Sequence, residues 1–156
     1  MKIGIIGIGM LGEAVALNLL NSGYDVAVYN RTKEKTIEVE KKGAKVMDSP
    51  KTVAENVELI IIIVKDSIAV REVAFGENGI IESKNKKLIV ADMSTIDSIE
   101  SKNIANQFQQ NHIQKLEIPV MGGPNVAITG KLVMMASGPK DSFDQCKTIF
   151  EKIANK

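Results

Sequence analysis

Hydrophobic and polar positions along this chain alternate between two periods. Short apolar runs, of which Leu59 to Val64 is the clearest, are typical of strands buried on both faces of a sheet. Segments with helical spacing lie between such runs, as in Leu11 to Leu20, where Leu11, Val15 and Leu19 share one face. This alternation predicts βαβ units with right-handed crossovers, and therefore a doubly wound α/β fold whose mostly parallel sheet carries helices on both faces.

The expected elements follow one another without a linker, a repeat or a low-complexity segment, so residues 1–156 are predicted to form a single domain. Ile37 is expected on the buried side of a charged second helix, and Asp66 or Ser67 is expected to cap the fourth. We predict strands at 2–8, 24–29, 44–47, 59–64 and 87–91, a sixth ending at 119–120 and one at about 131–136, and helices at 11–20, 32–42, 50–56, 67–75, 98–110 and 140–156, with a short helical or looped segment after 121–124.

Composition narrows the class of protein. Hydrophobic residues make up 44% of the chain and charged residues 25%, as in an ordinary globular domain. The 20 basic and 19 acidic residues leave a net charge of +1, so nucleic acid and anionic membranes are not expected partners. The lone Cys146 is interpreted as a small apolar residue on a helix face, and no apolar run is long enough to span a bilayer. We therefore predict a cytoplasmic protein.

A glycine-rich turn joins the first predicted strand to the first predicted helix, which is the context that makes this pattern specific for dinucleotides. The first glycine allows a tight turn, the second lets the backbone approach a pyrophosphate, and the third lets the helix pack closely on the sheet. The alternative is a structural turn without a ligand. We predict a Rossmann-type site in which the coenzyme pyrophosphate lies on the loop Gly7-Ile8-Gly9-Met10-Leu11-Gly12.

The end of the second predicted strand should approach the adenosine ribose. In NAD-binding proteins an Asp or Glu accepts a hydrogen bond from the 2′-hydroxyl there. This chain instead has Asn30, Arg31 and Thr32, a cation flanked by two polar side chains that suit a 2′-phosphate. The sequence therefore favours NADP over NAD, unless Arg31 is only a solvated surface residue.

Three blocks of sequence resemble the β-hydroxyacid dehydrogenase family, which includes 3-hydroxyisobutyrate dehydrogenase and the N-terminal domain of 6-phosphogluconate dehydrogenase. The resemblance covers nearly the whole chain and implies hydride transfer between NADP(H) and a small hydroxyacid or semialdehyde. The blocks are 7–32 (GIGMLGEAVALNLLNSGYDVAVYNRT), 92–96 (DMSTI) and 118–138 (IPVMGGPNVAITGKLVMMASG).

The resemblance also implies roles for residues at the expected carboxyl ends of strands. Thr95 matches a position that contacts the nicotinamide end of the coenzyme, and Ser94 beside it is assigned to the substrate. The alternative interpretation is that Ser94 and Thr95 only cap the helix that begins near Ser98. The residues Val64, Lys65 and Asp66 are expected to line the coenzyme at the end of the fourth strand.

The loop Met121-Gly122-Gly123 matches the family's substrate-binding Ser-Gly-Gly, whose hydroxyl and backbone N–H groups hold a carboxylate. Met121 replaces the serine and removes a hydroxyl donor, so a carboxylate would be held more weakly or the substrate is less acidic. Imine reductases, a related branch, tolerate other residues here. The alternative interpretation is that the loop is only a turn and binds no substrate.

Members of the family continue for more than a hundred residues into an all-helical domain that supplies a general-acid lysine, which this chain is expected to lack. A positioned acid contributes about a hundredfold to ten-thousandfold to such a reaction. We therefore assign no catalytic residue and no metal, and expect catalysis only when a second domain completes the substrate site. The lysines of the last helix are interpreted as solvated charges: Lys140, Lys147, Lys152 and Lys156.

Two other classes stay open, namely a coenzyme-binding module without chemistry, such as a redox sensor, and a remnant that has lost its coenzyme. The apolar face of the last helix, without the cover of a helical domain, predicts a homo-oligomer. His112 is expected at the surface between a helix and a strand. That apolar face comprises Phe143, Ile149, Phe150 and Ile153.

Overall fold

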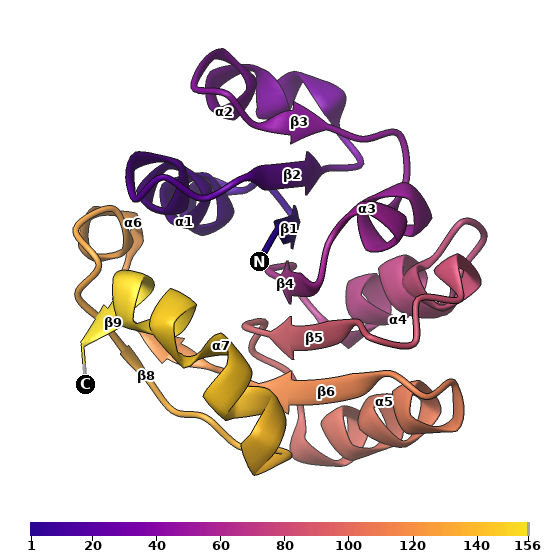
Figure 1. Ribbon diagram of the computed structural model, residues 1–156. Coiled ribbons are helices and arrows are strands. Elements are labelled where there is room, and N and C mark those ends of the chain that lie inside the picture. The colour runs from indigo at the N-terminus through magenta and orange to yellow at the C-terminus, as the bar shows by residue number, and fades with distance from the viewer. Residues whose placement is uncertain (156) are drawn as a thin grey trace.

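A computed structural model describes residues 1–155 of the protein (Figure 1). Strands and helices alternate through most of the chain in the predicted order, with 3₁₀ turns at Lys33–Thr36 and Ile80–Ser83. The strands are β1 (Ile3–Ile6), β2 (Val26–Tyr29), β3 (Lys45–Val46), β4 (Leu59–Ile62), β5 (Ile89–Asp92), β6 (Gln114–Glu117), β7 (Val120–Met121), β8 (Leu132–Met134) and β9 (Ala154–Asn155). The helices are α1 (Met10–Asn21), α2 (Ile37–Lys41), α3 (Pro50–Asn56), α4 (Ser67–Phe75), α5 (Ser98–Gln110), α6 (Pro124–Ala127) and α7 (Lys140–Ile153).

The main sheet has six parallel strands in the order β3-β2-β1-β4-β5-β6. Ile3 of β1 is paired with Val26 of β2 on one side and with Leu59 of β4 on the other. The strands that follow β1 are added on one side of it up to β3, and those from β4 onward are added on its other side. The strand order therefore reverses between β1 and β4, and sheets of this kind bind ligands there, beyond the carboxyl ends of the strands. The predicted doubly wound Rossmann fold is confirmed.

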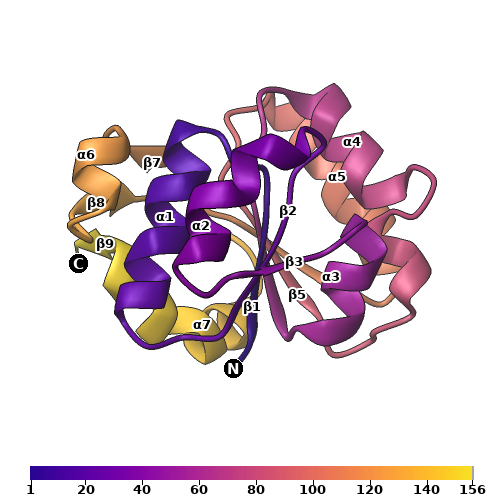
Figure 2. The same ribbon diagram turned by 90° about the horizontal axis from the view of Figure 1, so that it is seen from above.

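Both faces of the sheet are covered by helices (Figure 2). α1, α2, α6 and α7 lie on one face, and α3, α4 and α5 on the other. Successive side chains of a strand enter opposite layers, so Ile61 packs with α1 and α7, whereas Ile60 and Ile62 pack with α3, α4 and α5. This double burial explains why β4 reads as an unbroken apolar run.

The third part of the fold is a small sheet formed by β7, β8 and β9, in which β7 and β8 are antiparallel. The prediction that the sixth strand ends at Pro119-Val120 was wrong. β6 ends at Glu117, and the chain then crosses to the small sheet, where Met121 pairs with Val133. The last helix likewise ends at Ile153 instead of continuing, since residues 154–155 pair with β8. Lys156 lies outside the described residues.

Two predictions of burial were also wrong. Ile37 is 45% exposed and Val39 is buried, because the 3₁₀ turn Lys33–Thr36 rotates the following helix relative to one continuous α-helix. The apolar face of α7 is not left partly uncovered, because Ile149, Phe150 and Ile153 are at most 3% exposed against the sheet and α1, with Phe143 partly buried beside them.

Several smaller expectations are confirmed. Asp66 caps α4 by accepting a hydrogen bond from the Ala69 amide, and His112 is exposed between α5 and β6 at a φ of 60°. Cys146 is fully buried in α7, and this burial raises the pKa of its thiol to about 11. Among the residues that the structure describes, no helix is long and apolar enough to cross a membrane.

Candidate functional site

The glycine loop takes the close-packed shape that its sequence predicts. Gly7 has a φ of 102°, and a Cβ there would lie 2.0 Å from the carbonyl oxygen of Ile63, which directly follows the neighbouring strand β4. A Cβ on Gly12 would lie 1.9 Å from the carbonyl oxygen of Gly7. At the first and third positions of the loop, glycine is therefore required by close contact with the protein's own backbone.

Gly9 differs from the other two glycines. A Cβ there would meet no atom of residues 1–155 within 4 Å, and its backbone is extended, with φ of −85° and ψ of −168°. Gly9 is the N-cap of the 12-residue helix α1, and no side chain caps the free amides of the first turn within the described part of the chain. An open helix N-terminus beside a residue without a side chain is an arrangement that accepts phosphate.

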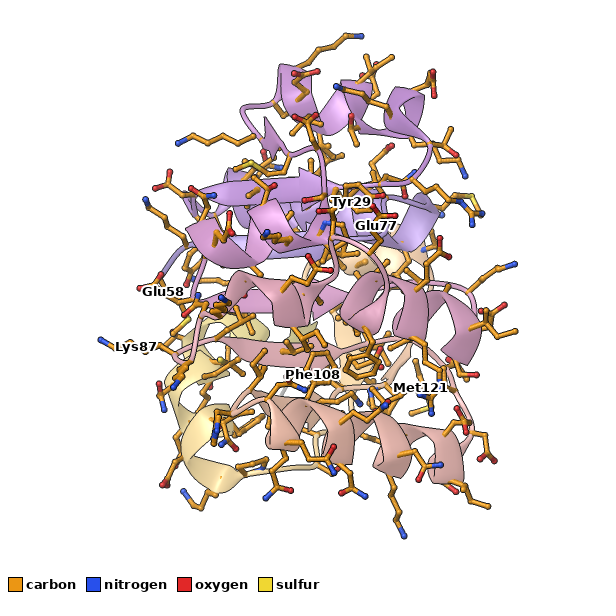
Figure 3. The ribbon with its side chains drawn as sticks, turned by 90° about the vertical axis from the view of Figure 1, so that its right-hand side faces the viewer. Tyr29, Glu58, Glu77, Lys87, Phe108 and Met121 are labelled. Carbon is orange, nitrogen blue, oxygen red and sulfur yellow. The ribbon has the colours of Figure 1, made fainter. Side chains whose placement is uncertain are left out.

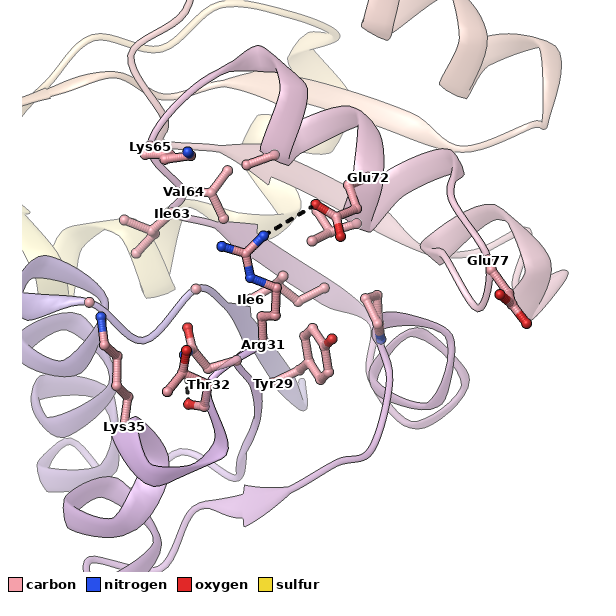
Figure 4. A pocket seen from close by; sticks show the side chains of 16 residues that line it. Ile6, Tyr29, Arg31, Thr32, Lys35, Ile63, Val64, Lys65, Glu72 and Glu77 are labelled. Carbon is pink, nitrogen blue, oxygen red and sulfur yellow. Dashed lines mark hydrogen bonds and ion pairs between the residues drawn. The ribbon is translucent and has the colours of Figure 1, made fainter.

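A cavity of about 300 Å³ opens in front of this loop (Figure 4). It lies at the carboxyl ends of β1, β2 and β4 and is closed on one side by α4. Of the residues predicted to bind coenzyme, it brings together Gly7, Gly9, Asn30, Arg31, Thr32, Val64 and Lys65. The sequence did not indicate its other polar or charged members, Tyr29, Lys35, Glu72 and Glu77.

Arg31 extends into this cavity from the end of β2. Its guanidinium Nη1 lies 3.7 Å from Oε2 of Glu72 on α4, and the two side chains are 76% and 60% exposed. Such an exposed pair contributes little to stability, so an anionic ligand can replace the carboxylate at low cost. Glu72 joins the site only through the packing of α4, and its position in the sequence gave no sign of this.

Asn30 lines the cavity as expected and also makes two hydrogen bonds within the protein. Its Oδ1 accepts a hydrogen bond of 2.8 Å from the Ile8 amide, and its Nδ2 donates one of 2.8 Å to the Thr32 carbonyl. The side chain therefore ties the glycine loop to the end of β2. This link restricts how far the glycine loop can lie from Arg31.

The predicted residues at the ends of β4 and β5 form a second group. The Val64 amide donates to Oγ of Ser94 at 3.0 Å, and Ser94 is only 5% exposed, whereas Thr95 is exposed. Asp66 is engaged as the cap of α4, where the Ala69 amide holds the pKa of its carboxyl below the usual value, and Lys65 Nζ lies 3.5 Å from its Oδ2. Ser94, Thr95 and Asp66 are not among the residues that line the cavity.

The Met121-Gly122-Gly123 loop lies outside the cavity as well. Met121 is 58% exposed, and Gly122 has a φ of 125°, a conformation that favours glycine. Gly123 is the N-cap of the four-residue helix α6, whose residues Pro124 and Asn125 share a groove with Gly9 and Met10. The loop is thus connected to the glycine loop through α6, although it does not line the cavity in front of that loop. No set of three or more His, Cys, Asp or Glu within residues 1–155 is grouped to hold a metal.

Taken together, the sheet order, the glycine loop and the cavity in front of it define a dinucleotide-binding domain. Residues 2–156 match the family model described as the NAD binding domain of 6-phosphogluconate dehydrogenase, and the chain belongs to this family. The resemblance expected from the three sequence blocks is therefore confirmed.

Similar proteins and solved structures agree with this family assignment. The chain is 38% identical to the uncharacterized oxidoreductase YkwC of Bacillus subtilis over 95% of its own length and 51% of the relative's, and 32% identical to a probable mitochondrial 3-hydroxyisobutyrate dehydrogenase of Dictyostelium discoideum over 96% and 46%. A solved structure, Psf3 in complex with NADP+ and 2-OPP, matches with a TM-score of 0.91 and 26% identity, over 97% of this chain and 54% of that one. The chain spans about half the length of these relatives.

Proposed function

We propose that this chain is the coenzyme-binding part of an NADP-dependent oxidoreductase that transfers hydride between the coenzyme and a small hydroxyacid or semialdehyde. The observation that carries the proposal is Arg31, an exposed cation at the end of β2 inside the cavity, where NAD-binding proteins have a carboxylate. A 2′-phosphate would take the place of the Glu72 carboxylate, and the Thr32 hydroxyl would add a donor.

The bound nicotinamide would supply or accept the hydride. The residues of this chain would bind and orient: the free amides of α1 hold the pyrophosphate, and Thr95 lies at the end of β5 toward which the ring would extend. The Met121-Gly122-Gly123 loop would hold the substrate. Because Met121 offers no hydroxyl, we propose that the substrate is bound chiefly by backbone amides and by groups of a second domain, which would also supply the proton.

Arg31→Ala is expected to weaken NADPH binding by about tenfold to a hundredfold and to leave NADH binding within about twofold. The physical reason is the loss of one or two charge-assisted hydrogen bonds that only the 2′-phosphate accepts. Both dissociation constants are measured by titrating the purified protein and following the fluorescence of the reduced nicotinamide.

Arg71→Ala is the matched control. Arg71 lies on α4 as Glu72 does, but it donates to Glu100 and Gln107 of α5 and does not line the cavity. Its removal should change neither affinity. An Arg31→Ala protein that keeps the native ratio of NADPH to NADH affinity contradicts the assignment to NADP.

We further propose a cytoplasmic homo-oligomer, now through the small sheet, since α7 is covered. Met121 of β7 pairs with Val133 of β8, and these two side chains and that of Met135, which follows β8, are each 48% exposed or more. Sedimentation velocity at high concentration is expected to show a dimer or larger species that Val133→Glu dissociates. A native chain that sediments as a monomer at every concentration contradicts this.

A further inference from the structure

Three ionisable side chains meet between β5, β6 and α5, outside the lining of the cavity. Asp92 ends β5, and Lys115 and Glu117 lie two residues apart on β6, so all three side chains enter the same layer of the fold. Lys115 Nζ lies 3.6 Å from Oδ2 of Asp92 and also contacts Oε1 of Glu117, which accepts from the Ser101 hydroxyl. The side chains of Lys115 and Asp92 are 1% and 0% exposed.

This cluster is connected to the ends of the two neighbouring strands. The other carboxylate oxygen of Asp92, Oδ1, accepts a hydrogen bond of 3.0 Å from the Ser94 amide. The Ser94 hydroxyl in turn accepts from the Val64 amide at 3.0 Å. A continuous series of contacts therefore runs from Glu117 through Lys115, Asp92 and Ser94 to Val64, which lines the cavity.

The charges of the cluster depend on one another. Burial raises the pKa of Asp92 and lowers that of Lys115, and the opposite charge of each partner counteracts the shift of the other. Within the described residues Asp92 Oδ2 has no hydrogen-bond donor, so the Lys115 ammonium is what compensates its charge. Without Lys115, Asp92 would become protonated or remain as an uncompensated buried charge.

A buried ion pair such as this one is weak evidence for a role in stability. Apolar residues of similar volume often replace buried ion pairs without loss of stability, whereas the fixed orientation of such a pair can serve specificity. Here the pair lies directly behind the segment that carries Ser94 and Thr95 at the end of β5.

We propose that Lys115 is a positioning residue for the nicotinamide half of the coenzyme. Its ammonium keeps Asp92 negatively charged, and Asp92, through Ser94, holds the segments after β4 and β5 in the arrangement that receives the ring. The inference rests on the proposed function, because it takes the coenzyme to extend from Arg31 along this edge of the sheet. The adenosine half, bound at Gly9 and Arg31, does not depend on the cluster.

The test compares two ligands on the same variant. NADPH contains the nicotinamide ring and 2′-phospho-ADP-ribose lacks it, while both contain the 2′-phosphate and the pyrophosphate. Lys115→Met is expected to weaken NADPH binding about tenfold and to leave 2′-phospho-ADP-ribose binding within about twofold, both measured by calorimetry. Ser94→Ala, which keeps the ion pairs and removes the acceptor for the Val64 amide, is expected to give the same selective loss.

Lys87→Met is the matched control, since Lys87 is exposed and lies at the opposite end of the sheet from Met121 (Figure 3). It should affect neither ligand. Circular dichroism verifies that each variant is folded, and Ser94→Ala decides the test should Lys115→Met not fold.

Equal loss of both ligands, or no loss of NADPH binding in the folded variants, overturns the proposal while leaving the proposed function intact. Failure of the native chain to bind 2′-phospho-ADP-ribose overturns the proposed function instead, and the positioning role with it.

Discussion

Gly9→Ala is expected to fold as the native chain does and to bind NADPH about a hundredfold more weakly, a loss of about 3 kcal/mol. The backbone at Gly9 is extended and open to any residue, and the added Cβ would meet no atom of residues 1–155 within 4 Å. The methyl group would instead occupy the space in front of the α1 amides that the pyrophosphate needs. Titration with NADPH measures the loss.

Urea unfolding of the same variant supplies the control. Removing glycine's extra freedom in the unfolded chain should leave the free energy of unfolding unchanged or raise it by about 0.4–1 kcal/mol. Native affinity for NADPH in the folded Gly9→Ala protein contradicts the placement of the phosphate on this loop.

Gly12→Ala is expected to lower the free energy of unfolding by about 2 kcal/mol. The added Cβ would lie 1.9 Å from the Gly7 carbonyl oxygen, so either α1 or the loop must move, at a cost of about 3 kcal/mol. The better helix propensity of alanine returns about 1 kcal/mol of this. Urea denaturation followed by circular dichroism measures the difference.

The contrast with Gly9→Ala is what makes this result informative, because the two substitutions are chemically the same and three positions apart. If Gly12→Ala is as stable as the native protein, then close packing between α1 and β1 is not what requires the third glycine of the loop.

The sequence predicted those parts of the protein that depend on residues close together along the chain. The glycine loop could be recognised because a strand, three glycines and a helix follow one another directly. Gly7 and Gly12 lie against backbone carbonyl groups, and Gly9 leaves the space in front of the helix open, as their positions imply. The buried β4 was equally plain, since a strand covered on both faces needs apolar residues at every position.

Features set by packing between distant elements could not be predicted. Ile37 was predicted to be buried and is exposed, because a 3₁₀ turn changed the rotation of the short helix that follows it, which no periodicity shows. Asn30 was expected at the coenzyme and does line the cavity, but no local pattern shows that its amide also joins the glycine loop to the end of β2, 22 residues away in the sequence. Lys115 was not singled out in the sequence, because its counter-charge on β5 becomes adjacent only when the sheet forms.

The prediction that the apolar face of α7 lacks part of its cover was wrong for a related reason. The helix has a strongly apolar side, and a missing cover was inferred from the length of the chain. In the structure that side packs on the main sheet and α1, as the interior of a single domain requires.

In the proposed complex a dinucleotide lies across the carboxyl ends of β1, β2 and β4, with its pyrophosphate at Gly9 and its 2′-phosphate at Arg31. The most direct measurement is a titration of isotope-labelled protein with NADPH, followed through the backbone amide resonances. The predicted result is saturable shifts concentrated at 8–12, 30–32 and 63–65, with 2–3, 56–58 and 86–88 at the opposite end of the sheet unaffected. Unchanged resonances at the glycine loop at millimolar NADPH, in a folded protein, would contradict it.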